Sequence, residues 1–211
     1  MEIAIIGGNI SGLALTHLLD EEYPNKFSIS IIEERAEIGF PSSGSGLLEN
    51  HEKWFEILDT WLVSPTYKPK LNQEYGLAFR RDWLEKDLAL SLMKKNIKIN
   101  VRTTVISQSE TSLTLMGVGG VSSIWNGDII IDCRKESNPH IIGVITNFPQ
   151  EKGWQRNDST WEGWYEKFPT DFNALQILDS YSSVIEENNL DFSLELAKSN
   201  FQKISNIYLN R

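Results

Sequence analysis

The first dozen residues constrain the fold more than any other part of this 211-residue chain. The run Ile3–Ile6 has the length and apolar character of a buried strand, and an apolar helical pattern follows a short glycine turn. A strand, a glycine turn and a helix in this order predict the βαβ unit that binds a dinucleotide. N–H groups at the helix start, with the positive end of the helix dipole, would hold the pyrophosphate. The candidate residues of this turn are Gly7, Gly8, Asn9, Ser11 and Gly12.

Asn9 stands where the motif G-x-G-x-x-G has its second glycine. That glycine normally lets the backbone come close to the phosphates, and asparagine adopts left-handed conformations more readily than most residues. The Asn9 amide could donate to a phosphate, or the substitution could mark a weakened or lost site. We expect that binding is retained.

The next strand, predicted over residues 27–32, ends in Glu33. A carboxylate at this position can accept hydrogen bonds from both hydroxyls of an adenosine ribose, and it would repel the 2′-phosphate of NADP. Glu34 is the candidate if the strand ends one residue later. The alternative is an ordinary solvated acidic turn.

Composition excludes several classes of function. A net charge of −9 argues against a nucleic-acid partner, because phosphate binding needs a basic surface. We expect no transmembrane segment, because no run of about 18 apolar residues exists, and no secretory signal. The single cysteine, Cys133, excludes an internal disulfide and predicts a cytoplasmic protein. His17, His51 and His140 have no metal-ligand spacing, so no metal site is expected.

The residues after Glu33 extend the pattern. Arg35 and Gly39 follow it as in the stretch E-[KR]-R-x-x-x-G, and Gly44–Leu47 reads Gly-Ser-Gly-Leu. Here the chain resembles the flavoprotein group that includes geranylgeranyl reductases and aromatic-ring hydroxylases. The reductase branch of this group often has C-S-G-L where this chain has Gly44–Leu47, so Gly44 stands in the place of the cysteine. The resemblance implies that Ser45 and Gly46 pass close to the flavin ring. Without it, this segment reads equally well as a flexible connector.

Three further positions match the same group. Arg81 begins the pattern R-x-x-L-x-x-x-L, which implies an arginine near the cofactor's phosphates and flavin, although an exposed arginine before a helix is the common alternative. Val105 matches the contact to the adenine. Asp132 aligns with the acid of an A-D-G segment, with Cys133 in place of the glycine. We interpret Cys133 as a small buried apolar residue, not a nucleophile.

The remaining patterns predict the other elements. We expect a helix over about 51–62, a short strand from Leu77 that enters an amphipathic helix, and a strand over 97–105. A hairpin is expected over 112–116 and 121–125, strands over 129–133 and 141–145, and two helices from about residue 171. The aromatic residues between Trp154 and Pro169, which are loosely similar to a geranylgeranyl reductase signature, could wall an apolar substrate pocket or fill a small core.

One segment of the flavoprotein group is missing. Its members are considerably longer and carry a late Gly-Asp segment at the flavin, whereas the one Gly-Asp pair here, Gly127-Asp128, precedes the wrong strand. The resemblance therefore covers residues 1–135 well and the rest weakly.

These observations predict an α/β protein with a Rossmann-type, three-layer FAD/NAD(P)-binding fold, a small β-hairpin and a reduced substrate region. We expect a FAD-binding domain over 1–140 with an inserted segment at about 51–76, and a reduced cap with C-terminal helices over 141–211. The predicted function is FAD-dependent oxidation or reduction of a small apolar or aromatic molecule. No catalytic side chain is assigned, since the flavin carries the electrons.

Three alternatives stay open. An NAD-dependent dehydrogenase would use the same βαβ unit and a general acid or base near residues 130–140, with His140 as the candidate. A truncated, non-catalytic protein would keep only the scaffold. A partner chain or a homodimer could complete the flavin site.

Overall fold

The computed structural model describes residues 1–64, 68–135, 141–167, 173–180 and 182–210. The chain forms two compact units, each built from separated segments. Unit 1 comprises residues 1–40, 88–134 and 194–211, and unit 2 comprises residues 41–87 and 135–193.

Unit 1 is built on a parallel sheet. Its strand order is β10-β1-β2-β6, and every neighbouring pair is parallel. The strands are β1 (Glu2–Ile6), β2 (Ser28–Ile32), β6 (Lys98–Asn100) and β10 (Ile129–Asp132). After their first residue, β1 and β2 are buried throughout, as expected for parallel strands covered on both faces.

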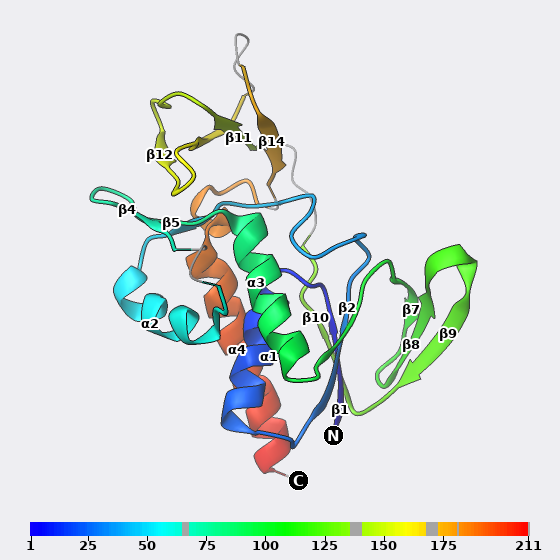
Figure 1. Ribbon diagram of the computed structural model, residues 1–211. Coiled ribbons are helices and arrows are strands. Elements are labelled where there is room, and N and C mark those ends of the chain that lie inside the picture. The colour runs from blue at the N-terminus through cyan, green and yellow to red at the C-terminus, as the bar shows by residue number, and fades with distance from the viewer. Residues whose placement is uncertain (65–67, 136–140, 168–172, 181, 211) are drawn as a thin grey trace. The chain divides into compact units, whose positions relative to one another are not determined.

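Helices and a second sheet cover the two faces of this parallel sheet (Figure 1). The helical layer contains α1 (Ile10–Glu22) and the later parts of α3 (Arg81–Lys94) and α4 (Leu190–Leu209). The other layer is the antiparallel sheet β7 (Thr104–Gln108), β8 (Ser112–Met116) and β9 (Ser122–Asn126), with the 3₁₀ turn η2 (Val118–Gly120). Leu113 and Leu115 of β8 pack with Ala4, Ile6 and Ile32 of the parallel sheet. Unit 1 therefore has the predicted three layers.

An aromatic cluster joins the last turns of α4 to the end of α1. The ring of Tyr23 lies 5.1 Å from Tyr208 and 6.2 Å from Phe201, and Phe27 lies 5.1 Å from Tyr208, between ring centroids. Aromatic pairs at these distances contribute about 0.5–1.5 kcal/mol each beyond the area they bury. The C-terminal helix is thus an integral part of unit 1.

Unit 2 contains two small sheets and a helix. The antiparallel sheet β12-β13-β11-β14 comprises β11 (Ile142–Thr146), β12 (Gly153–Gln155), β13 (Trp161–Tyr165) and β14 (Gln176–Asp179). The sheet β3-β5-β4 comprises β3 (Leu47–Leu48), β4 (Lys70–Asn72) and β5 (Gly76–Ala78). The helical elements are α2 (His51–Trp61) and the 3₁₀ turn η3 (Glu186–Asn188). Leu47, Ala78, Ile145, Trp154 and Trp164 share one core, so these two tryptophans fill a core as one of the two interpretations expects.

Two predicted elements were wrong. The strand expected over 97–105 is divided into β6 and β7, because Arg102 adopts a φ of 52° and its N–H donates to the carbonyl of Arg35. The first of the two C-terminal helical patterns contains β14, whose Leu178 is buried against β11, so pairing in the sheet overrides the helical pattern.

The compact units also divide the chain differently from the expected division at residue 140. Residues 41–87 belong to unit 2, and the end of α4 belongs to unit 1, because a sheet of this kind collects strands and helices from distant parts of the chain. The assignment of cofactor and substrate binding to particular regions stays a prediction.

Candidate nucleotide site

The candidate residues of unit 1 meet at one edge of the parallel sheet. Because β1, β2 and β10 are parallel, Gly7, Glu33 and Asp132 lie at the carboxyl ends of neighbouring strands. The N–H of Gly7 donates to the carbonyl of Ile32 at 2.8 Å, and the N–H of Cys133 donates to Ile6 at the same distance. Ligands of open α/β sheets bind at this edge.

The glycines allow a turn that side chains would block. Gly7 has a φ of 106°, which side chains rarely permit, and a Cβ on Gly12 would lie 2.1 Å from the carbonyl oxygen of Gly7. Gly12 thus lets α1 start directly against the preceding turn. Close packing of helix and strand is the role that the predicted motif gives this glycine.

Gly12→Ala is expected to lower the free energy of unfolding by about 1–3 kcal/mol, although alanine favours helices, because the clash is with backbone. Urea denaturation measures the change. Gly117→Ala is the matched control, since its Cβ would meet only the Val121 carbonyl oxygen at 3.8 Å. Equal effects of the two substitutions would contradict the packing argument.

Asn9 caps α1 in an extended conformation, with φ −90° and ψ 178°. Its Oδ1 accepts the N–H of Gly12 at 3.1 Å, and its Nδ2 donates to the carbonyl of Cys133 at 2.6 Å. Because this backbone is extended, the tolerance of asparagine for left-handed conformations, which the sequence suggested as its role, is not used here. Asparagine serves instead through the hydrogen bonds of its side chain. The side chain links the glycine turn to the end of β10.

The N–H groups of Ile10 and Ser11 stand at the start of α1. In the described part of the chain, neither Ile10 nor Ser11 donates its N–H, and the Ser11 hydroxyl also has no hydrogen-bond partner. Both residues are buried, and the first N–H groups of a helix have no acceptor within the helix itself. Buried donors of this kind are rare in folded proteins, and an anion bound at the helix start would satisfy them.

Glu33 is buried, at 4% exposure, directly beside the glycine turn. Its carboxylate accepts the N–H of Gly8 at 2.7 Å, and the N–H and guanidinium of Arg35 at 2.8 and 3.0 Å. Burial by itself raises the pKa of Glu33, but the hydrogen bonds and charge of Arg35 and the N–H of Gly8 outweigh it. The pKa therefore lies below its usual value, and the group is ionised at neutral pH. A carboxylate has about four acceptor positions, so one remains for a ribose hydroxyl. Glu34, the other candidate, is exposed.

Val105 and Asp132 flank this arrangement. Val105 of β7 packs against the cluster of Ala4 and Ile32, and the nearby Thr103 N–H donates to the Glu33 carbonyl. Asp132 pairs with Arg134 at 2.6 Å. Burial raises the pKa of Asp132, but the hydrogen bonds and charge of Arg134 outweigh it and hold the pKa below its usual value. Cys133 is buried, as interpreted from the sequence.

The candidates of unit 2 are held by its own backbone and side chains. The N–H of Ser45 donates to Asn188, and that of Gly46 donates to the carboxylate of Glu162 at 3.1 Å. Arg81, at 3% exposure, pairs with Glu85 at 3.2 Å and donates to the Ser45 carbonyl at 2.9 Å. These N–H groups therefore have partners within unit 2, and a role for Ser45, Gly46 and Arg81 at a cofactor stays a prediction.

Glu162 is a notable residue that the sequence interpretation missed. It lies on β13, is 1% exposed, and also accepts the indole N–H of Trp164 at 2.8 Å. Burial raises the pKa of Glu162 above its usual value, although the charge of Arg156 and the hydrogen bonds act against this. A detectable signal was present, because strand alternation puts Glu162 on the same face as Trp164.

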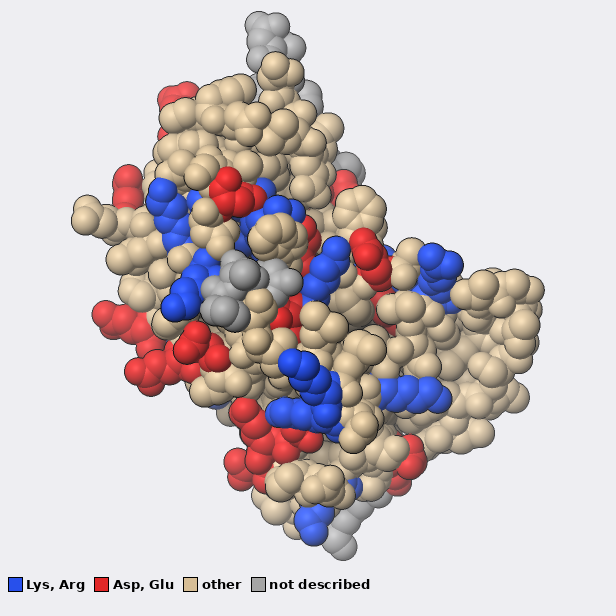
Figure 2. Space-filling model, viewed as in Figure 1, with Lys and Arg blue, Asp and Glu red and all other residues tan. Residues whose placement is uncertain are grey.

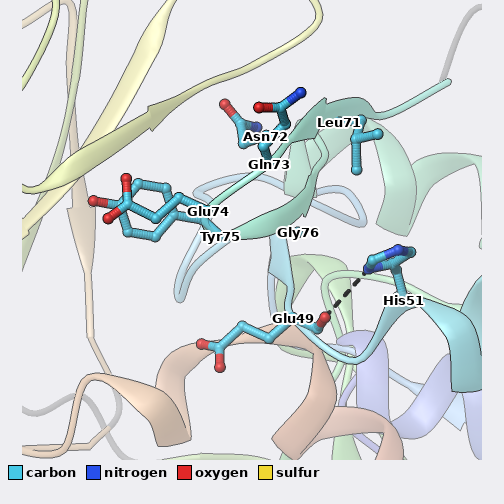
Figure 3. A pocket seen from close by; sticks show the side chains of 8 residues that line it. All are labelled: Glu49, His51, Leu71, Asn72, Gln73, Glu74, Tyr75 and Gly76. Atoms are coloured by element: carbon cyan, nitrogen blue, oxygen red, sulfur yellow. Dashed lines mark hydrogen bonds between the residues drawn. The ribbon is translucent and has the colours of Figure 1, made fainter.

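Unit 2 also has a pocket, of about 370 Å³, that none of the predicted site residues lines (Figure 3). Its walls come from the β4–β5 hairpin and from the start of α2, where His51 Nδ1 lies 3.4 Å from the carbonyl of Glu49. Among the described residues, no group of three or more histidine, cysteine or acidic side chains could hold a metal ion. None of the described helices combines the length and apolar character needed to cross a bilayer.

No family model matches the chain. Among curated proteins it is similar to the FAD-dependent monooxygenase janM of Penicillium janthinellum, with 23% identity over 155 residues, which are 62% of this chain and 32% of that protein. Among solved structures it is similar to a geranylgeranyl bacteriochlorophyll reductase-like protein of Thermoplasma acidophilum. The TM-score is 0.57 at 12% identity, over 95% of this chain and 60% of the other. The fold is that of the Rossmann-type flavoproteins.

A flavoprotein/dehydrogenase of Cytophaga hutchinsonii also has this flavoprotein fold, with a TM-score of 0.54 and 12% identity over 78% of this chain and 55% of the other. The chain spans about a third of the curated relative and less than two thirds of each of these two solved chains. The resemblance to FAD-dependent oxidoreductases stated from the sequence is confirmed at the level of the fold.

Proposed function

We propose that this chain binds FAD through unit 1 and serves oxidation or reduction of a small organic molecule. The observation that carries the proposal is the buried, ionised Glu33 beside the glycine turn. It lies at the same end of the parallel sheet as the N–H groups of Ile10 and Ser11, for which the described residues supply no acceptor. An acid for the ribose hydroxyls and N–H donors for the pyrophosphate are what an adenosine diphosphate moiety requires. The FAD-dependent monooxygenase similar to this chain supports FAD over NAD.

The residues of unit 1 fit the adenosine half of the cofactor. Ile10 and Ser11 would donate to the pyrophosphate, Glu33 would accept a ribose hydroxyl, and Val105 would contact the adenine. When bound, FAD supplies the electron transfer, and the chain holds and orients it. We propose an apolar or aromatic small molecule as the substrate. We also propose a cytosolic location, which the single buried Cys133 supports.

A visible absorption spectrum of the purified protein tests the proposal. Flavin bands in the protein, or their appearance after incubation with FAD and removal of the excess, would support it. Colourless protein that fails to take up FAD would instead favour the non-catalytic scaffold. The hydrogen bonds that the Ser45 and Gly46 N–H groups make within unit 2 support that alternative. His140, the candidate general acid or base of the NAD-dependent alternative, lies outside the described residues.

Glu33→Ala is expected to weaken FAD binding by about 1–3 kcal/mol, about 5- to 150-fold, because it leaves buried donors and the ribose hydroxyl without an acceptor. Flavin fluorescence titration measures the dissociation constant. Glu34→Ala, a change of the same kind at the exposed neighbour, should leave it unchanged. A similar loss in both variants, or in neither, would remove Glu33 from the site.

A further inference from the structure

The antiparallel sheet of unit 1 ends in a strand whose outer edge is open. In the order β7-β8-β9, the described residues form no ladder on the far side of β9. Four of its five residues are exposed, with Ile124 at 71%, and Val118 and Val121 in the turn that precedes it are 66% and 67% exposed. An exposed edge strand without charged side chains readily pairs with another chain.

The hydrogen-bond pattern shows which groups face the open edge. The N–H of Gly117 donates to Val121 and the N–H of Gly127 donates to Thr111, both at 2.9 Å, at the two ends of the β8–β9 ladder. Bonded and non-bonded pairs alternate along an antiparallel ladder, so the residues of β9 bonded to β8 are 123 and 125. The N–H and C=O groups of Ser122, Ile124 and Asn126 therefore point outward.

The other edge of the sheet is protected. β7 has an irregularity between Val105 and Ser107, where β7 has one extra residue, Ile106, opposite a single step of β8 from Leu115 to Thr114. Such bulges twist an edge and prevent pairing, whereas β9 keeps a regular register over all five residues. Only one of the two edges is therefore suited to add a strand.

The lack of charged side chains at this edge favours a second copy of the chain as its partner. Residues 112–127 contain no charged side chain, although 23% of the whole chain is charged, and the outer end of this sheet is uncharged in Figure 2. The net charge of −9 on each copy opposes association, and contact through an uncharged strand adds no local repulsion between like charges to it. A basic partner would instead be attracted to the acidic surface elsewhere.

We propose that two copies of this chain associate through antiparallel pairing of their β9 edges. A two-fold axis at Ile124 places its outward N–H and C=O groups opposite those of the second copy, and pairs Ser122 with Asn126. The two three-stranded sheets then form one six-stranded sheet whose outer edges are the bulged β7 strands. Both Ile124 side chains leave water at the axis, and each contacts its equivalent, as an isologous interface requires.

Sedimentation velocity over a wide range of protein concentration tests the proposal. We expect a reversible dimer, and Ile124→Lys should raise its dissociation constant about tenfold or more, because it places two like charges opposite one another. Ile106→Lys is the matched control, an exposed isoleucine on the protected β7 strand. Circular dichroism confirms that both variants are folded. A wild-type chain that stays monomeric, or a dimer equally sensitive to both substitutions, would overturn the proposal.

Oxidative cross-linking tests the register independently. In Ile124→Cys the two introduced thiols would lie on residues about 5.5 Å apart between Cα atoms, within the range of a disulfide. A covalent dimer should form on mild oxidation. Ser123→Cys, whose side chain belongs to the other face, should not form one, and the buried Cys133 does not interfere. Cross-linking through position 123 but not 124 would show that another pairing occurs.

Discussion

Arg81→Met is expected to lower the free energy of unfolding by about 3–5 kcal/mol, because it leaves the buried carboxylate of Glu85 without its cation. Arg81 and Glu85 are 3% and 1% exposed, and their side chains meet at 3.2 Å. The guanidinium also donates to the carbonyls of Ser45 and Asn188 at 2.9 and 3.2 Å, so the substitution removes these two buried hydrogen bonds as well. Urea denaturation at neutral pH measures the loss.

The exposed pair of Arg134 and Asp132 provides the matched control. These side chains are 41% and 38% exposed, so Arg134→Met removes the same cation at a cost of about 0–1 kcal/mol. The double variant Arg81→Met with Glu85→Leu should recover part of the loss, because it removes both buried charges. Equal costs at positions 81 and 134 would show that burial of the Arg81 pair contributes nothing.

Stability is expected to fall by about 3 kcal/mol between pH 6.5 and about pH 4 because of His17 alone. Burial lowers the pKa of His17 from 6.5 to about 4, although a hydrogen bond to the Leu88 carbonyl at 3.2 Å acts in the opposite direction. Between these values the unfolded chain binds a proton that the folded chain does not bind. The contribution is therefore complete above pH 6.5 and is lost as the pH falls towards 4, at about 1.4 kcal/mol per unit.

The free energy of unfolding of the wild type and of His17→Gln, measured by urea denaturation across this pH range, isolates the effect. Glutamine can still donate to the Leu88 carbonyl but does not titrate, so its curve should be flatter by about 3 kcal/mol over the interval. The acidic residues titrate in both proteins and cancel in the difference. Parallel curves, or an NMR titration of His17 near 6.5 in the folded protein, would contradict the prediction.

Local patterns predicted much of unit 1. The apolar run of β1, the glycine turn, α1 and the acid at the end of β2 are specified by neighbouring residues, and parallel pairing then brings Gly7, Glu33 and Asp132 to one edge. The hairpin of β8 and β9 followed in the same way from alternation around a glycine-rich turn. These features depend on periodicity and turn chemistry, which are readable over a few residues.

Pairing between distant residues could not be predicted. Nothing near Asn9 indicates that its amide donates to the carbonyl of Cys133, 124 residues further along the chain. The bond between Gly46 and Glu162 spans 116 residues in the same way. β14 follows a helical pattern yet forms a strand, because β11 offers it a partner and a buried place for Leu178.

The sequence by itself determined the βαβ unit of residues 3–33 and the acid that closes it, because strand, turn and helix are each specified by residues a few positions apart. Only the tertiary structure decided what these residues contact. It made Asn9 a helix cap, buried Glu33 against Gly8 and Arg35, and left the Ile10 and Ser11 N–H groups without a described partner. Burial and long-range hydrogen bonds set these outcomes, and neither exists until the distant segments of the chain have packed together.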